Sequence, residues 1–149
     1  MKPVAVLVVD DSEIDRYLLT RDLTKIGLGD HVFEASDGLE ALEFLSNFDE
    51  NKAQFGARFP PDVILLDINM PRMGGFEFLE RLVALRDTRK AYETLVVLMF
   101  SSSEHPNEHH FALHQDIVTD FVVKGAITSE ELKEKIRMAH ASGLKRASS

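Results

Sequence analysis

The sequence of 149 residues contains no cysteine and no tryptophan. Without cysteine, the chain can have no disulfide, no thiolate nucleophile and no thiolate zinc site. Long apolar runs are also missing. The first run covers only residues 4–9 and stops at Asp10 and Asp11, which is too short and too abruptly acidic for a signal peptide or a membrane span. We therefore expect a cytoplasmic protein that does not associate with membranes.

Positive charge is in deficit. The chain has 25 acidic and 17 basic side chains, for a net charge of −8. Proteins that bind nucleic acids need a basic surface for the phosphate backbone, so we expect no nucleic-acid partner.

What the chain does have is enough apolar residues, 44%, to form one core at this length. We expect a single domain over residues 1–149. Its core should span about residues 4–140, with an extended loop at 48–61 and a C-terminal tail at 141–149. The loop is expected because charged residues, Gly56 and the pair Pro60 and Pro61 break any clear period.

Apolar runs alternate along the chain with segments of helical period. The runs cover residues 4–9, 31–33, 63–66, 95–100 and 121–123, and the helical segments lie around 14–26, 39–45, 76–83 and 132–136, with a less distinct one after Pro106. Continuous apolar strands separated by amphipathic helices are typical of a parallel sheet buried on both faces. The sequence therefore predicts an α/β fold with a doubly wound, five-stranded parallel sheet and helices on both faces.

Polar residues follow four of the five runs. Asp10 and Asp11 follow the first, Asp67 the third, Ser101 the fourth and Lys124 the fifth. Because the carboxyl ends of parallel strands meet at one edge of the sheet, these side chains should converge. Their carboxylates would repel one another without a hard cation, and oxygen ligands of this kind suit Mg²⁺.

This set of groups fits one reaction. A carboxylate can attack a phosphoryl group when a divalent ion and a side-chain cation neutralise the charge on the transferring oxygens. Asp67 is the candidate nucleophile because its strand is expected at the centre of the sheet. Lys124 would balance negative charge, and the hydroxyl of Ser101 would hydrogen-bond the phosphoryl group.

Three motifs resemble the receiver domain of bacterial two-component response regulators. Residues 8–12 (VVDDS) resemble the acidic pair of that family, residues 65–75 (LLDINMPRMGG) its phosphoacceptor strand and loop, and residues 121–124 (FVVK) its lysine strand. The resemblance covers about residues 4–140. It implies a flavodoxin-like fold with strand order 2-1-3-4-5, an order known from chemotaxis receivers and flavodoxin. More distantly, the chain resembles stand-alone regulators of phytochrome-type histidine kinases, in its long segment 48–61, its three serines at 101–103 and Pro106.

Carried over by position, the resemblance implies Asp67 as the phosphorylated residue and Asp10, Asp11, Asp67 and the backbone carbonyl of Asn69 as Mg²⁺ ligands. Ser101 takes the hydroxyl position, with Ser102 as the alternative. Phe121 takes the position of an aromatic switch residue that moves inward with Ser101 on activation. Gly125 follows the lysine where the family usually has proline, so the usual cis peptide bond there is not expected.

The function implied is that of a single-domain response regulator rather than an enzyme acting on external substrates. It would take a phosphoryl group from a histidine kinase or a phosphotransfer protein and signal to an unknown downstream protein, as a monomer or a weak homodimer.

Two other classes of protein remain open. One is a binding module that keeps the fold as an unphosphorylated scaffold, although Asp11, Asp67 and Lys124 are all intact. The other is a phosphohydrolase of the haloacid dehalogenase type. Such an enzyme needs a second aspartate two residues after the nucleophile, where this chain has Asn69, and it usually has a cap domain.

Overall fold

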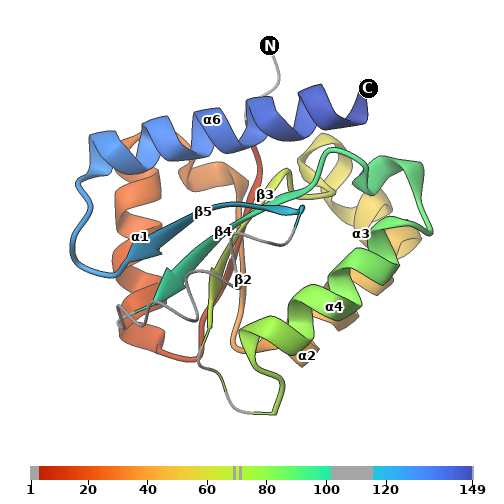
Figure 1. Ribbon diagram of the computed structural model, residues 1–149, viewed down its shortest axis with the longest axis horizontal. Helices are drawn as coiled ribbons and strands as arrows, with labels where there is room; N and C mark the ends of the chain where they lie inside the picture. Colours follow the sequence, from red (N-terminus) through yellow and green to blue (C-terminus); the bar gives the residue numbers. More distant parts are fainter. Residues whose placement is uncertain (1–3, 69, 71, 102–115, 149) are drawn as a thin grey trace.

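A computed structural model of the protein describes residues 4–68, 70, 72–101 and 116–148, and its centre is a parallel β-sheet (Figure 1). The strands are β1 (Val6–Val9), β2 (Val32–Ala35), β3 (Val63–Asp67), β4 (Val96–Ser101) and β5 (Val118–Val123). They are hydrogen-bonded in the order β2-β1-β3-β4-β5. The predicted fold class and strand order are therefore confirmed, with strand ends shifted by up to three residues.

Helices cover both faces of the sheet. On one face lie α1 (Glu13–Lys25) and α6 (Ser129–Ala147), and on the other lie α2 (Gly38–Ser46), α3 (Phe48–Phe55) and α4 (Gly75–Arg86) (Figure 1). The helix expected after Pro106 lies outside the described residues. Among the described residues, no helix combines the length and the apolar character needed to span a bilayer.

Side chains alternate along each strand between two cores. Leu7, Ile64, Leu66, Val97 and Met99 face α2 and α4, whereas Val6, Val8, Leu65, Leu98 and Phe100 face α1 and α6. Successive strand residues point to opposite faces, so a strand buried on both sides must be apolar throughout. This explains the continuous apolar runs of the sequence.

The prediction of an extended loop at 48–61 is wrong. Residues Phe48–Phe55 form α3, and a short 3-10 helix follows at Gly56–Arg58. Aromatic packing explains the helix: the ring of Phe55 lies 4.9 Å from that of Phe33, and the ring of Phe48 lies 5.4 Å from that of Phe59. The ring of Phe48 also lies 5.6 Å from that of Tyr92. Because Phe33 and Tyr92 are distant in sequence from the helix, local periodicity could not reveal it.

The predicted tail at 141–149 is also shorter than expected, since α6 continues to Ala147. The guanidinium of Arg146 donates hydrogen bonds to the backbone carbonyl oxygens of Glu93 and Leu95 at 2.9 and 2.8 Å, which anchors the last turn of the helix. The small residues of 141–149 favoured a frayed end of the helix. In the structure they allow the backbone of α6 to approach the sheet closely instead.

That approach depends on Gly143. A Cβ atom at this position would lie 2.1 Å from the backbone oxygen of Thr94 and 2.9 Å from Cγ1 of Val96. The backbone of α6 thus lies against the residues that lead into β4, at a distance that only glycine permits.

We expect Gly143→Ala to lower the free energy of unfolding by roughly 1–3 kcal/mol, because the added methyl group meets fixed backbone. Helix propensity alone predicts the opposite sign, since alanine is the better helix former by about 1 kcal/mol. Urea unfolding would measure the difference, with Ser142→Ala, at an exposed position of the same turn, as the control. A Gly143→Ala variant as stable as this control would contradict the proposed close contact.

Candidate functional site

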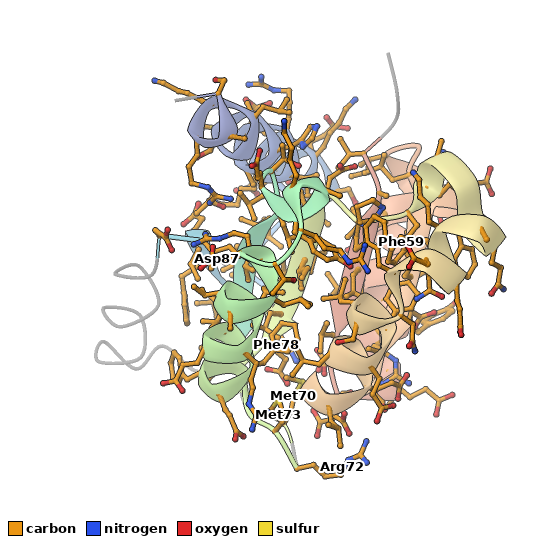
Figure 2. The ribbon with its side chains drawn as sticks, turned by 90° about the vertical axis from the view of Figure 1, so that its right-hand side faces the viewer. Phe59, Met70, Arg72, Met73, Phe78 and Asp87 are labelled. Carbon is orange, nitrogen blue, oxygen red and sulfur yellow. The ribbon has the colours of Figure 1, made fainter. Side chains whose placement is uncertain are left out.

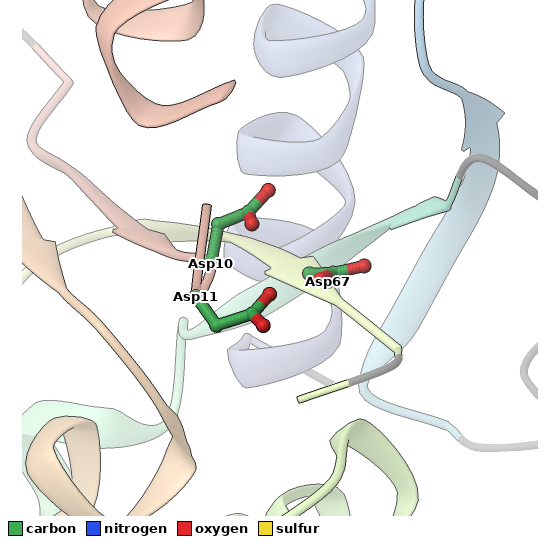
Figure 3. A group of neighbouring side chains, drawn as sticks. All are labelled: Asp10, Asp11 and Asp67. Carbon is green, nitrogen blue, oxygen red and sulfur yellow. The ribbon is translucent and has the colours of Figure 1, made fainter. Parts of the chain in front are cut away.

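Three carboxylates meet where β1 and β3 end (Figure 3). Asp10 and Asp11 directly follow β1, and Asp67 is the last residue of β3. The two strands pair in parallel, with Val9 opposite Leu66, so the residues that follow them are brought to the same edge. One oxygen from each carboxylate lies within 4.8 Å of the others. The structure thus brings Asp10, Asp11 and Asp67 together, as the sequence predicted.

Asp10 is held by the start of α1. Its Oδ1 accepts a hydrogen bond from the backbone N–H of Ser12 at 2.9 Å, and its backbone oxygen accepts one from Nη1 of Arg16 at 2.7 Å. The side chain of Asp10 is 2% exposed, and that of Asp67 is 7% exposed. Asp11, in contrast, is exposed to solvent. The cluster therefore has two buried carboxylates and one on the solvent side.

Lys124 supplies the positive charge. Its Nζ lies 2.6 Å from Oδ2 of Asp10, 2.9 Å from Oδ2 of Asp15 and 3.6 Å from Oδ1 of Asp67. Burial by itself would lower the pKa of Lys124. The hydrogen bonds to Asp10 and Asp15, and the charges of Asp67 and Asp10, outweigh burial and hold this pKa above its ordinary value. The side chain is therefore an ammonium ion throughout the physiological pH range.

The residue after this lysine, Gly125, has a backbone conformation that proline could not adopt. Its φ is +81°, whereas the proline ring restricts φ to about −65°. A left-handed glycine therefore forms the turn after β5, and Lys124 still reaches both Asp10 and Asp67.

The acidic cluster has the properties of a metal site. Three carboxylates and one ammonium leave two negative charges uncompensated, before Asp15 is counted. Carboxylate oxygens this close to one another are the donor set preferred by small hard cations such as Mg²⁺. The chain could therefore bind a divalent ion here. The fourth predicted ligand, the carbonyl of Asn69, lies outside the described residues.

The predicted switch residues belong to neighbouring strands. Ser101 ends β4 and pairs with Val123 of β5, but its side chain is not among those described, and Ser102 lies outside the described residues. Phe121 lies in β5 opposite Met99 and is 8% exposed, packed in the core that faces α2 and α4. The structure thus places Ser101 in the strand beside β3 and Phe121 in the strand after it, and their switch roles remain predictions.

Sequence reasoning assigned no role in the site to Asp15, and it did not identify the pair Asp37–Arg72. Asp15 lies in the first turn of α1, and its partner Lys124 is 109 residues away. Arg72 and Asp37 are 35 residues apart. No local pattern of the sequence indicates either pair.

Arg72, labelled in Figure 2, follows β3 and pairs with Asp37 at the start of α2. Oδ1 of Asp37 accepts the backbone N–H of Glu40 at 2.9 Å and caps α2, while Oδ2 accepts both Nε of Arg72, at 2.7 Å, and Nη2. Asp37 is buried, and Arg72 has a φ of +62°, which is unusual for a residue other than glycine. These contacts fix Arg72, five residues after Asp67, to the start of α2.

Gly75 brings α4 to the same loop. A Cβ atom there would lie 2.8 Å from Cα of Ile68 and 2.9 Å from the backbone oxygen of Asp67. The N–H of Gly75 also donates to the backbone oxygen of Ile68 at 2.8 Å. The start of α4 therefore lies in direct contact with the backbone of the candidate nucleophile.

Comparison with known proteins shows which family the chain belongs to. The family model of the response regulator receiver domain matches residues 6–137. The protein-glutamate methylesterase/protein-glutamine glutaminase 2 of Xanthomonas oryzae pv. oryzae is 35% identical over 145 residues, which is 92% of this chain and 36% of that protein. The corresponding protein of Nitrosomonas europaea is 30% identical over 98% of this chain and 38% of its own length.

Solved structures lead to the same family. The chemotaxis protein CheY4 of Vibrio cholerae is 30% identical with a TM-score of 0.68, over 93% of this chain and 99% of that one. A two-component response regulator from Cytophaga hutchinsonii has the same fold, with a TM-score of 0.77 at 24% identity over 93% and 98% of the two chains. The chain therefore belongs to the receiver domain family of two-component response regulators. It spans little more than a third of the methylesterase relatives, so the activities in their names are not transferred to it.

The ion pair of Asp37 should make stability depend on pH. Burial opposes ionisation of this carboxyl, but the N–H of Glu40 and the guanidinium of Arg72 outweigh it and hold its pKa below the ordinary value of about 4. The pair therefore stabilises the fold above about pH 4 and is lost as the pH falls through the lower, folded-state pKa.

We expect Asp37→Asn to be less stable than the wild type at pH 7 by about 1 kcal/mol, because Arg72 is partly in solvent and asparagine still caps the helix. Below about pH 4 the difference should shrink. Urea unfolding at several pH values would measure it, with Glu134→Gln, which removes an exposed ion pair to Arg137, as the control. A difference for Asp37→Asn that is the same at pH 7 and pH 3 would contradict this assignment.

Proposed function

We propose that this chain is a phosphoacceptor signalling protein in which Asp67 receives a phosphoryl group from a histidine kinase or a histidine phosphotransfer protein. The observation that carries the proposal is the surroundings of Asp67. A buried carboxylate at the end of the central strand has two further carboxylates and one ammonium beside it. A receiver domain without a phosphoacceptor role would gain nothing from crowding like charges in this way.

In the proposed reaction, one carboxylate oxygen of Asp67 attacks the phosphorus atom of the donor. A new P–O bond forms as the bond from phosphorus to the donor nitrogen breaks, and the imidazole keeps the electron pair of that bond. With acetyl phosphate as donor, the P–O bond to acetate breaks instead. The product in both cases is an aspartyl phosphate.

Each residue of the site has a part in this proposal. Asp10, Asp11 and Asp67, with the backbone carbonyl of Asn69, would hold Mg²⁺, which when bound neutralises charge on the transferring oxygens. Lys124 would pair with the phosphoryl group. Ser101 would donate a hydrogen bond to the phosphoryl group and move toward it, and Phe121 would then fill the space that Ser101 leaves. The resulting change of surface would be the signal.

The phosphodonor would approach along α1. Ile14, Tyr17 and Leu18 are large apolar side chains on this helix that are 72%, 65% and 38% exposed. Beside them lies a cavity of about 240 Å³ whose lining includes Leu18, Ile127 and Lys124. A donor protein must come within bonding distance of Asp67, and an apolar surface that reaches Lys124 is where it would bind.

The proposal predicts phosphorylation that requires both Asp67 and Mg²⁺. Incubation with acetyl phosphate and Mg²⁺ should add the mass of one phosphoryl group to the wild-type protein, in an acid-stable and base-labile linkage. The same incubation with a metal chelator should add none, and Asp67→Asn should gain none under either condition. Intact mass spectrometry would measure all of these.

Asp87→Asn is the matched control, because it makes the same substitution at an exposed position at the far end of α4. It should be phosphorylated as the wild type is. If the folded wild-type protein gains no phosphoryl group from acetyl phosphate or from a phosphorylated kinase, the proposal is wrong and the scaffold interpretation is favoured. Turnover of small phosphate esters with Asp67 intact would favour a phosphohydrolase.

A further inference from the structure

Lys124 is shared among three carboxylates, and Asp67 is the most distant of them. The ammonium lies 2.6 Å from Asp10 and 2.9 Å from Asp15, but 3.6 Å from Asp67. Of the three N–H donors of the ammonium, one is hydrogen-bonded to Asp15, and the group also lies in a close ion pair with Asp10. Of the three carboxylates, that of Asp67 therefore makes the longest contact with Lys124, although Lys124 is the residue expected to pair with the phosphoryl group on Asp67.

Asp15 differs from the other two partners of Lys124. It is not part of the group of three carboxylates that could hold a metal ion. Its position is set by α1, where its backbone N–H donates to Oγ of the capping residue Ser12 at 3.2 Å. Its side chain is 37% exposed, whereas that of Asp10 is 2% exposed. Asp15 is thus the partner of Lys124 that water can reach.

This difference in exposure between Asp10 and Asp15 decides which of the two contacts Lys124 can lose at the lower cost in free energy. When a negative phosphoryl group appears on Asp67, the attraction of Lys124 toward that position increases. Leaving buried Asp10 would strand a desolvated charge, which is costly. Leaving Asp15 costs much less, because water can solvate its carboxylate.

We propose that Asp15 is a positioning residue that holds Lys124 back from Asp67 and competes with the phosphoryl group for it. This inference rests on the proposed function, since it assigns a further residue to the same site. The consequence is that Asp15 weakens the binding of a phosphoryl group at Asp67. The unphosphorylated arrangement is thereby favoured until a phosphodonor acts.

The test measures the affinity of Asp67 for a phosphoryl mimic. Beryllofluoride, formed from beryllium and fluoride in the presence of Mg²⁺, binds to carboxylates in the place of a phosphoryl group, and ¹⁹F NMR would follow its titration into the full chain. Asp15→Asn keeps the size of the side chain and removes its charge. We expect it to bind beryllofluoride roughly 3–10-fold more tightly than the wild type, the effect of removing one charged competitor at a partly exposed site.

Two further variants separate this role from a general effect of charge. Glu13→Gln removes the same charge from an exposed position in the same turn of α1, and its affinity should stay within about twofold of the wild type. Asp15→Glu restores a carboxylate that can reach Lys124, and it should return the affinity toward that of the wild type. Circular dichroism and thermal unfolding would check that each variant is folded.

The outcomes are distinct. Tighter binding in Asp15→Asn, with wild-type behaviour in the other two variants, supports the inference. If Asp15→Asn binds no more tightly than Glu13→Gln, or if Asp15→Glu behaves as Asp15→Asn does, the inference is overturned while the proposed function stands. If the folded wild type neither binds beryllofluoride nor gains a phosphoryl group from acetyl phosphate, both are overturned.

Discussion

The site depends on one constraint of topology with an electrostatic consequence, which is the parallel pairing of β1 with β3. Parallel strands end at the same edge of a sheet, so the carboxylates that follow β1 and end β3 must lie close together. Two of the three are buried, where their mutual repulsion is screened least. Lys124, placed by β5 on the same edge, is the cation that offsets part of this repulsion. The remaining imbalance is what makes the site suited to a divalent cation.

Much of this arrangement could be predicted from the sequence because it follows from periodicity and order. The apolar runs identify the strands, and the polar residue after each run identifies the edge where Asp67 and Lys124 meet. At the start of α6, Thr128 and Glu131 form a capping box, a feature that four consecutive residues of the sequence are enough to specify.

The features that could not be predicted depend on contacts between distant residues. Helix α3 forms because Phe55 packs on Phe33 of β2 and Phe48 packs on Tyr92, and neither partner lies within 48–61. The last turns of α6 depend on a carbonyl oxygen of Thr94 that lies close to Gly143. The pairing of Lys124 with Asp15 spans 109 residues and depends on how α1 is placed beside β5. In each case the local sequence permits the structure, and the tertiary contact selects it.

The aromatic residues around α3 have a consequence for the molecule as a whole. Phe33, Phe59 and Tyr92 lie at or just before the starts of β2, β3 and β4, at the opposite edge of the sheet from the acidic cluster. Figure 2 shows Phe59 well apart from Arg72 and Met73, which lie near the carboxyl ends of the strands. Close aromatic packing at one edge supplies cohesion that the other edge, with its crowded charges, lacks. Local opening, as seen by amide hydrogen exchange, would therefore be graded along the strands, slow near their amino ends and faster near Asp67.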